Sequence, residues 1–214
     1  RELAERAAAR NYSGLVLTVD NQLIGNRERD IRNGFAIPPR LGPKEVAAMA
    51  YKWRWLLRMR NELTTLTMGN YVKPGDKAGI REIAGALGAR LDPGLSWKDV
   101  DALRAIWKGP LILKGILSPA EAREAAERGV DSVIVSNHGG RQLDGAMAGL
   151  DALPRIAEAV AGRMPVLVDG GIRRGADVVK ALALGAAASL IARPQLWGLA
   201  IGGEAGVTHV LDIF

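Results

Sequence analysis

The chain contains no cysteine, and this absence excludes several kinds of chemistry. Disulfides, thiolate nucleophiles and iron–sulfur clusters or haems held through cysteine are all excluded. Histidine is nearly as scarce, because His138 and His209 are the only two in the sequence. Two histidines are too few for a multi-histidine metal site, so we expect no metal. The lack of cysteine also suits a reducing compartment, and we expect the protein in the cytoplasm.

Long apolar runs are missing as well. No stretch approaches the roughly 18 apolar residues of a membrane-spanning helix, and no secretion signal is visible at the start. The 214 residues, 48% of them apolar, are enough for one sizeable domain with a real core. The sequence opens on a helical pattern without a cap and stops in the middle of another pattern. We therefore expect both ends to be cut from a longer polypeptide.

The net charge of +6 belongs to one segment. Residues 38–90 carry ten Lys and Arg against four Asp and Glu, and the rest of the chain is balanced at nineteen of each. Such a local excess does not indicate a general affinity for nucleic acid, and we expect no nucleic-acid partner.

Within this basic segment, aromatic residues alternate with cations at Tyr51, Lys52, Trp53, Arg54 and Trp55. Aromatic rings and cations together suit an anionic membrane surface. The sequence thus predicts a peripheral contact of residues 40–90 with the inner membrane. The alternative is an active-site lid whose arginines are simply solvated.

Short apolar strands alternate with helices along most of the chain. We predict strands at 14–19, 111–115, 132–136, 165–168 and 187–191. We predict helices at 1–10, 44–60, 96–107, 118–129, 150–161, 176–184 and from 202 onward. This alternation indicates a parallel sheet.

The expected fold class is α/β, as a partial (β/α)8 barrel. Five strands cannot close a barrel, so the chain would hold about strands 4 to 8. Residues 1–214 would then be an incomplete barrel domain, with residues 38–95 as a long insertion of loop and helix after the first strand present. An open flavodoxin-like sheet is the structural alternative.

Residues 131–145 are the most informative stretch. The apolar run 132–135 suits a strand buried on both faces, and it leads into Ser136, Asn137 and His138. Two glycines then make a tight turn before Arg141. Parallel α/β folds place their sites at the carboxyl ends of strands, so a base and an anion clamp are predicted here. The plainer interpretation is a buried histidine beside a solvated arginine.

Other strands also end in polar residues. Thr18 and Asp20 follow the first strand, and Lys114 ends the second. Because a barrel brings the carboxyl ends of its strands to one face, we expect these side chains to converge.

A phosphate site is predicted after the last two strands. The turn D-G-G-I-R-R-G at 169–175 precedes a helix, where free backbone N–H groups and the helix dipole favour an anion. Arg173 and Arg193 would add charge-assisted hydrogen bonds. Barrels hold phosphate after strands seven and eight, which assigns this chain to strands four to eight.

These motifs resemble the FMN-dependent L-2-hydroxy acid oxidase and dehydrogenase family. The matching segments are L-T-V-D, G-N-R-E-R-D, L-K-G-I, S-N-H-G-G-R-Q-L-D-G, D-G-G-I-R-R-G and K-A-L-A-L-G-A. They occur in the right order and cover nearly the whole chain except about 40–90. The insertion bearing Trp and Arg is most similar to the mandelate dehydrogenase branch of the family.

The resemblance implies FMN as cofactor and a small 2-hydroxy acid, mandelate- or lactate-like, as the substrate. The acid would be oxidised to the 2-oxo acid, with electrons passing through FMN to quinone or oxygen. We also expect a homo-oligomer.

The resemblance also implies roles for individual residues. His138 matches the active-site base, Asp20 its carboxylate partner and Lys114 a cation at the flavin. Arg141 and Arg27 match residues that bind the substrate carboxylate. The cofactor-binding positions correspond to Thr18, Lys114, Ser136, Asp169, Gly170, Gly171, Ile172, Arg173, Ala192 and Arg193.

Elementary chemistry supports these roles. Proton removal from a 2-hydroxy acid needs a base that changes charge near neutral pH, as imidazole does. A planar guanidinium grips a carboxylate through two hydrogen bonds. A cation near the flavin would stabilise its anionic reduced form.

The sequence departs from the family pattern at two positions, and two alternative functions stay open. The family usually has Gly where this chain has Ala192, and Arg where it has Gly34. A peptide-modifying relative would lack the arginine of H-G-G-R, so Arg141 argues against that function. A non-catalytic remnant that binds flavin or a partner is the other alternative.

Overall fold

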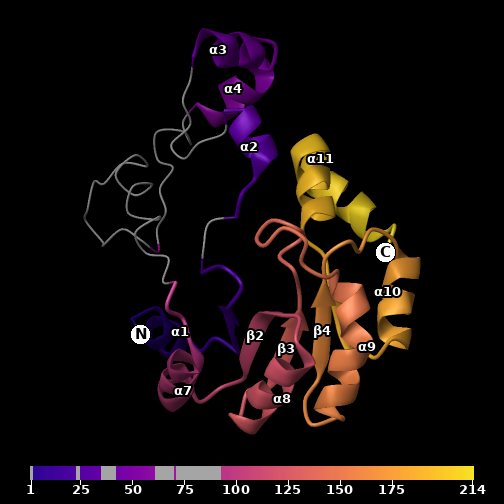
Figure 1. Cartoon of the computed structure of the whole chain (residues 1–214). Coiled ribbons are helices and arrows are strands. Elements are labelled where there is room, and N and C mark those ends of the chain that lie inside the picture. Colours follow the sequence, from indigo (N-terminus) through magenta and orange to yellow (C-terminus); the bar gives the residue numbers. More distant parts are fainter. Residues whose placement is uncertain (1, 23–24, 35–41, 61–69, 71–92) are drawn as a thin grey trace. The chain divides into compact units, whose positions relative to one another are not determined.

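The computed structural model describes the chain except for residues 1, 23–24, 35–41, 61–69 and 71–92. The chain divides into two compact units, one made of Arg1–Asn26 with Pro93–Phe214 and the other of Arg27–Asp92. The first unit is larger and contains the whole described sheet (Figure 1). Most of the predicted insertion 38–95 lies outside the described residues.

The sheet has five parallel strands: β1 Leu15–Thr18, β2 Leu111–Ile116, β3 Ser132–Val135, β4 Val166–Asp169 and β5 Ala188–Leu190. Their order in space is the order in the sequence. A flavodoxin-like sheet reverses its strand order at one point, and this sheet does not. The sequential order is that of a barrel wall, and each strand lies within a residue or two of its predicted position.

The register places the chemically interesting residues on one side of the sheet. Thr18 pairs with Lys114, and Lys114 pairs with Ile134. Because side chains alternate along a strand, the residues one position away point to the opposite face. That opposite face forms the core, with Leu113, Val135 and their neighbours fully buried.

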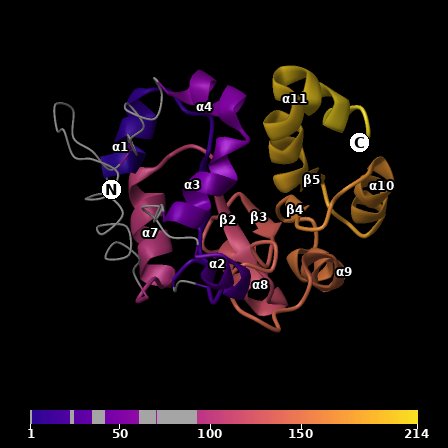
Figure 2. The same ribbon diagram turned by 90° about the horizontal axis from the view of Figure 1, so that it is seen from above.

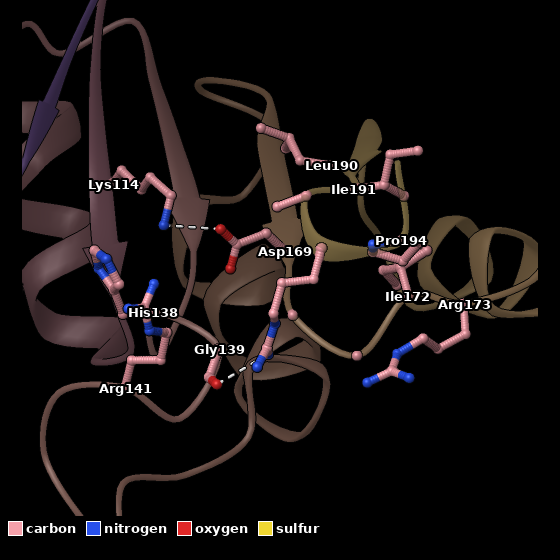
Figure 3. Close-up of a pocket in the computed structure, with 14 residues that line it drawn as sticks. Lys114, His138, Gly139, Arg141, Asp169, Ile172, Arg173, Leu190, Ile191 and Pro194 are labelled. Atoms are coloured by element: carbon pink, nitrogen blue, oxygen red, sulfur yellow. Dashed lines mark hydrogen bonds and ion pairs between the residues drawn. The ribbon is translucent and has the colours of Figure 1, made fainter. Parts of the chain in front are cut away.

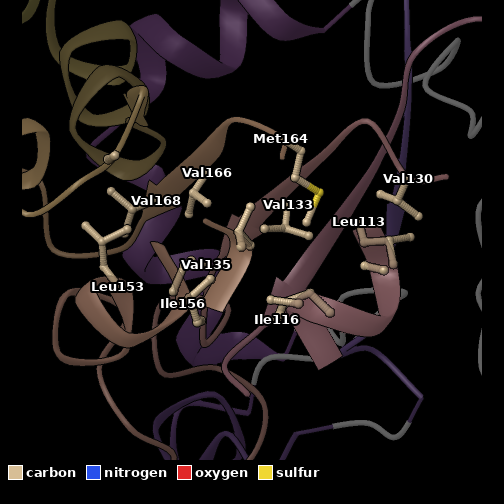
Figure 4. Close-up of a cluster of buried hydrophobic side chains, with 14 of the residues drawn as sticks. Leu113, Ile116, Val130, Val133, Val135, Leu153, Ile156, Met164, Val166 and Val168 are labelled. Carbon is tan, nitrogen blue, oxygen red and sulfur yellow. The ribbon is translucent and has the colours of Figure 1, made fainter. Parts of the chain in front are cut away.

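Helices cover the core face. They are α1 Glu2–Ala9, α7 Trp97–Ile106, α8 Pro119–Glu127, α9 Gly149–Val160 and α10 Gly175–Ala183. Figure 2 shows α8, α9 and α10 following one another around the outside of the strands. Leu153 and Ile156 of α9 pack among the strand valines (Figure 4), and each such buried side chain contributes about 1.5–3 kcal/mol.

The starts of two helices follow the sequence signals. Ser118 precedes Pro119 and its hydroxyl accepts a hydrogen bond from the N–H of Glu121. Asp99 accepts hydrogen bonds from the backbone N–H and the hydroxyl of Ser96, at 2.8 and 2.9 Å. These bonds hold the pKa of Asp99 below its usual range, and the one from the backbone N–H of Ser96 has the largest effect.

Three helices differ in detail from the predictions. The last, α11 Arg193–Leu211, is two helices joined by a kink at Gly203; the second matches the helix predicted from 202 onward, and the first, which begins at Arg193, was not predicted. Pro194 lies in its first turn, where proline is favoured, and Gly203 makes the kink at which the apolar pattern restarts. The helix predicted at 44–60 is two helices, α3 Pro43–Ala50 and α4 Trp53–Met59. The carbonyl of Lys52 accepts from the N–H groups of Trp55 and Leu56 and starts the second.

The third difference is α2 Glu28–Arg32, where no helix was predicted. Five residues are too short to show a helical period. Acidic residues in its first turn and Arg32, paired with Glu28 at 2.8 Å, suit the helix dipole. Gly34 follows with a φ of +64°, a conformation that the arginine usual in the family would adopt only with strain.

Three aromatic side chains of the second unit are exposed to solvent. Tyr51, Trp53 and Trp55 are 73%, 55% and 49% exposed. Lys52 lies over the ring of Tyr51 and Arg54 over that of Trp53, at 5.5 and 5.3 Å from the ring centres. No helix in the described part of the chain is both long and apolar enough to cross a bilayer.

Candidate functional site

A cavity of about 280 Å³ opens at the carboxyl ends of the strands (Figure 3). Its lining comes from β2, from the last residues of β4 and β5, from the segments that follow β3, β4 and β5, and from the start of α11. The lining residues are Lys114, His138, Gly139, Arg141, Asp169, Gly170, Gly171, Ile172, Arg173, Leu190, Ile191, Ala192, Arg193 and Pro194. Most of the predicted site residues are therefore together in one place.

His138, which follows β3, is held by the carboxylate of Asp20, which follows β1 two strands away. Its Nδ1 lies 3.0 Å from Oδ1 of Asp20, and both side chains are largely buried. Nε2, the other ring nitrogen, has no hydrogen-bond partner within the described part of the chain and can meet a molecule in the cavity. The remaining oxygen of this carboxylate, Oδ2, is buried without a hydrogen-bond partner among the described residues.

Backbone geometry makes room for this pair. Gly115 forms a bulge in β2 with a φ of +108°. A Cβ there would lie 2.6 Å from Cγ of Asp20, so the close approach requires glycine.

The turn after β3 is unusual because His138, Gly139 and Gly140 all have positive φ, at 59°, 68° and 71°. A non-glycine residue in this region costs about 1–3 kcal/mol, and such strain is concentrated at functional sites. Asn137 stabilises the turn, since its Oδ1 and its backbone carbonyl both accept from the N–H of Gly140 at 3.1 Å.

Lys114 makes a second polar cluster beside the histidine. Its ammonium donates to Oδ2 of Asp169 and to the hydroxyl of Ser136, both at 2.8 Å. The same hydroxyl accepts from the backbone N–H of His138 at 3.0 Å. Oδ1 of Asp169 is buried and has no hydrogen-bond partner in the described part of the chain.

Two arginines extend the cavity away from the histidine. Arg193 donates to the carbonyl of Gly139 at 3.1 Å. The guanidinium of Arg173 lies over the indole ring of Trp197, 5.0 Å from its centre. Figure 3 shows Arg173 far from His138 across the cavity.

The start of α10 differs from the sequence-based picture of free N–H groups. The carboxylate of Asp177 accepts from the backbone N–H groups of both Arg173 and Arg174, at 3.0 and 3.1 Å. These two amides are therefore engaged within the chain. An anion at this turn would depend on the arginine side chains and on the other amides of the turn.

A few predicted residues lie elsewhere. Ser136 and Asp20 stand behind the lining, each one hydrogen bond away from it. Thr18 ends β1 beside Lys114 in the register and is not among the lining residues. Arg27 belongs to the other unit, where it precedes α2.

Sequence reasoning also missed residues. Gln142 donates to the carbonyl of Asp20 and to the side chain of Asn21, at 3.2 and 2.8 Å. The one sequence signal for Gln142 was its position directly after Arg141.

Ala192 has a negative φ of −134°, so the backbone does not demand glycine at this position.

The charges of the lining define a ligand class. Asp169 is the one carboxylate in the described lining, whereas Lys114 and three arginines are its cations. Such a cavity suits an elongated, anionic and hydroxyl-bearing molecule. Among the described residues no group of three or more His, Cys, Asp or Glu is arranged to hold a metal.

Comparisons with known proteins match the whole chain. The profile of the family described as FMN-dependent dehydrogenase matches residues 1–214. An L-lactate oxidase of Nostoc sp. is 47% identical over 213 residues, covering 100% of this chain and 53% of that protein. The 2-hydroxyacid oxidase 1 of Mus musculus is 44% identical, with the same two coverages. The chain thus spans about half the length of the curated relatives it matches.

Solved structures give the same picture. The crystal structure of the monotopic membrane protein (S)-mandelate dehydrogenase matches with a TM-score of 0.91 and 39% identity, over 99% of this chain and 56% of that one. A mandelate oxidase with bound (S)-2-phenylpropionate matches with a TM-score of 0.72 and 37% identity, over 99% and 50%. These matches confirm the partial (β/α)8 barrel.

Proposed function

This chain belongs to the FMN-dependent dehydrogenase family, and we propose that the complete protein oxidises an L-2-hydroxy acid to the 2-oxo acid with His138 as base. The observation that carries the proposal is the pairing of His138 with Asp20 at the mouth of a cationic cavity. The substrate class comes from the relatives, whose names refer to lactate, 2-hydroxyacids and mandelate.

FMN, the cofactor of this family, fits the donors and acceptors of the cavity. The buried, unpartnered oxygen of Asp169 can accept a hydrogen bond from a ribityl hydroxyl. Arg173 and Arg193 can meet a phosphate, and Lys114 can donate to the flavin ring. When bound, FMN supplies the acceptor for the two electrons of the oxidation. We infer that Thr18, Ser136, Ala192 and residues 170–172 complete this site.

The base is oriented for its task by the chain itself. With Nδ1 facing Asp20, Nε2 of His138 is free to take a proton from the substrate. The imidazolium that results is stabilised by the Asp20 carboxylate, which lies within hydrogen-bond distance. Arg141 lines the same cavity and binds the substrate carboxylate in this proposal. Arg27 is proposed as a second carboxylate ligand from the resemblance alone.

Our proposals for the electron acceptor and for the location of the protein rest on the second unit. We propose that residues 38–95 form an insertion in an incomplete FMN-binding barrel, and that it contacts an anionic membrane from the cytoplasmic side. Exposed Tyr51, Trp53 and Trp55 beside Lys52 and Arg54 support this contact. A membrane quinone is then the acceptor within reach, and oxygen is the alternative.

The membrane contact has its own test. The complete protein should sediment with anionic vesicles at low salt and be released by high salt, because surface attraction is screened. A variant with Trp53, Arg54 and Trp55 changed to Ser should stay in the supernatant. Equal sedimentation of both proteins would support the lid instead.

We also propose a homo-oligomer. Leu196, Leu199 and Ile201 of α11 are 54%, 53% and 89% exposed, and large exposed apolar side chains suit an interface with a second copy. Sedimentation velocity of the complete protein should give a mass of at least two copies.

Product analysis tests the reaction. The complete protein with FMN should convert L-mandelate or L-lactate to the 2-oxo acid with an artificial acceptor. Product should not form from the D-enantiomers. Formation of 2-oxo acid by neither L-acid would remove the proposed function.

A further inference from the structure

Two side chains hold the ammonium of Lys114, and the same residue lines the cavity. An ammonium has three N–H donors. One is directed to Oδ2 of Asp169 and one to the hydroxyl of Ser136, both at 2.8 Å. The third is left for a ligand, because Lys114 lines the cavity. The direction of this last donor is thus set by two other side chains.

Both partners are themselves fixed. Ser136 is fully buried and also accepts from the backbone N–H of His138, so its hydroxyl cannot move freely. Asp169 ends β4, paired in register with Leu190 of β5. The side chains of Lys114 and Asp169 are only 21% and 18% exposed, so water screens their charges weakly.

The carboxylate therefore acts on the cation in two ways. It holds the ammonium in place, and it offsets part of the positive charge that would otherwise act on a ligand in the cavity. Figure 3 shows the pair side by side on the cavity wall. The second carboxylate oxygen remains buried and unpartnered among the described residues, so Asp169 can contact a ligand hydroxyl and Lys114 together.

We propose that Asp169 is a positioning residue that sets the reduction potential of the bound cofactor through Lys114. This inference rests on the proposed occupation of the cavity by FMN. A cation near the flavin favours its anionic reduced form and raises the potential. The Asp169 carboxylate weakens that effect and keeps the potential lower than Lys114 alone would.

The test is a double-mutant cycle on the complete, FMN-loaded protein. The two-electron midpoint potential is measured by reductive titration against a reference dye, with no hydroxy acid present. Asp169→Asn should raise the potential by at least about 30 mV, which is a tenfold change in the equilibrium constant of a two-electron couple. In a Lys114→Met background the same substitution should shift the potential by less than half as much.

The control is Asp131→Asn. This substitution also removes a carboxylate that pairs with a cation, Arg104, at 2.8 Å, but Asp131 precedes β3 and so lies at the amino ends of the strands, away from the cavity. Its potential should match that of the parent.

Three outcomes would overturn the inference. They are an unchanged potential in Asp169→Asn, an undiminished shift in the Lys114→Met background, and loss of FMN at saturating concentration from both Asp169→Asn and Asp169→Ser. The last would show that Asp169 is needed to hold FMN in the cavity and does not act by setting its potential. A parent protein that fails to bind FMN, or binds it without oxidising hydroxy acids, would count against the proposed function instead.

Discussion

Nδ1 of His138 and Oδ1 of Asp20 lie 3.0 Å apart, although 118 residues separate them in the chain. The contact exists because β1, β2 and β3 are adjacent and parallel, so their carboxyl ends meet. All measurements below refer to the complete protein loaded with FMN.

His138→Ala should slow reduction of the flavin by substrate about 10²- to 10⁴-fold, the range for loss of a general base. FMN should stay bound, because His138 is expected to act on the substrate. Rapid-mixing absorbance gives the rate. His209→Ala is the matched control, since the exposed His209 lies on α11. A rate within tenfold of the parent would remove His138 from its role.

Asp20→Asn should keep the shape of the pair and lose the charge that stabilises the imidazolium. A hydrogen bond to a charged group contributes about 1.5–3 kcal/mol, so we expect flavin reduction to slow about 10- to 100-fold. Asp151→Asn on the exposed face of α9 is the control. Equal rates for the two variants would show that Asp20 is only structural.

Arg141→Lys keeps a positive charge and loses the two-pronged geometry. Arg141 is exposed in this structure, so the cost should fall at the low end for a charge-assisted bond, about tenfold in KM for the L-acid. Steady-state kinetics measures it, with exposed Arg155→Lys on α9 as control. An unchanged kcat/KM would place the substrate carboxylate elsewhere.

Trp197→Leu should weaken FMN binding by removing the ring under Arg173. An exposed cation–π contact contributes about 0.5–1 kcal/mol, which is a two- to fivefold rise in the Kd for FMN. Trp197→Phe keeps a ring and should lie between the parent and the Leu variant. If the Phe and Leu variants bind FMN equally weakly, then packing of α11, and not the stack, is responsible.

Much of this structure was predictable from the sequence because it depends on local signals. Apolar runs predicted all five strands, and polar residues at their ends predicted which side chains meet. Alternation along β2 and β4 explains why Lys114 and Asp169 both face away from the helix-covered core.

Other features depend on contacts that no local pattern carries. The Lys114–Asp169 pair was missed because each residue was assigned to the cofactor separately. The stack of Arg173 on Trp197 depends on the part of α11 before the kink at Gly203, which was not predicted. The turn between α3 and α4 contains neither glycine nor proline, so composition gave no sign of it.

The most direct test of the central claim is an anaerobic rapid-mixing experiment on the complete protein. FMN-loaded protein is mixed with L-mandelate or L-lactate, and the flavin absorbance is followed through a single reduction. The structure predicts that the flavin bleaches with at least one L-acid, and that His138→Ala suppresses this bleaching while His209→Ala does not. Persistent oxidised flavin with both acids, or equal bleaching in the two variants, would contradict the account.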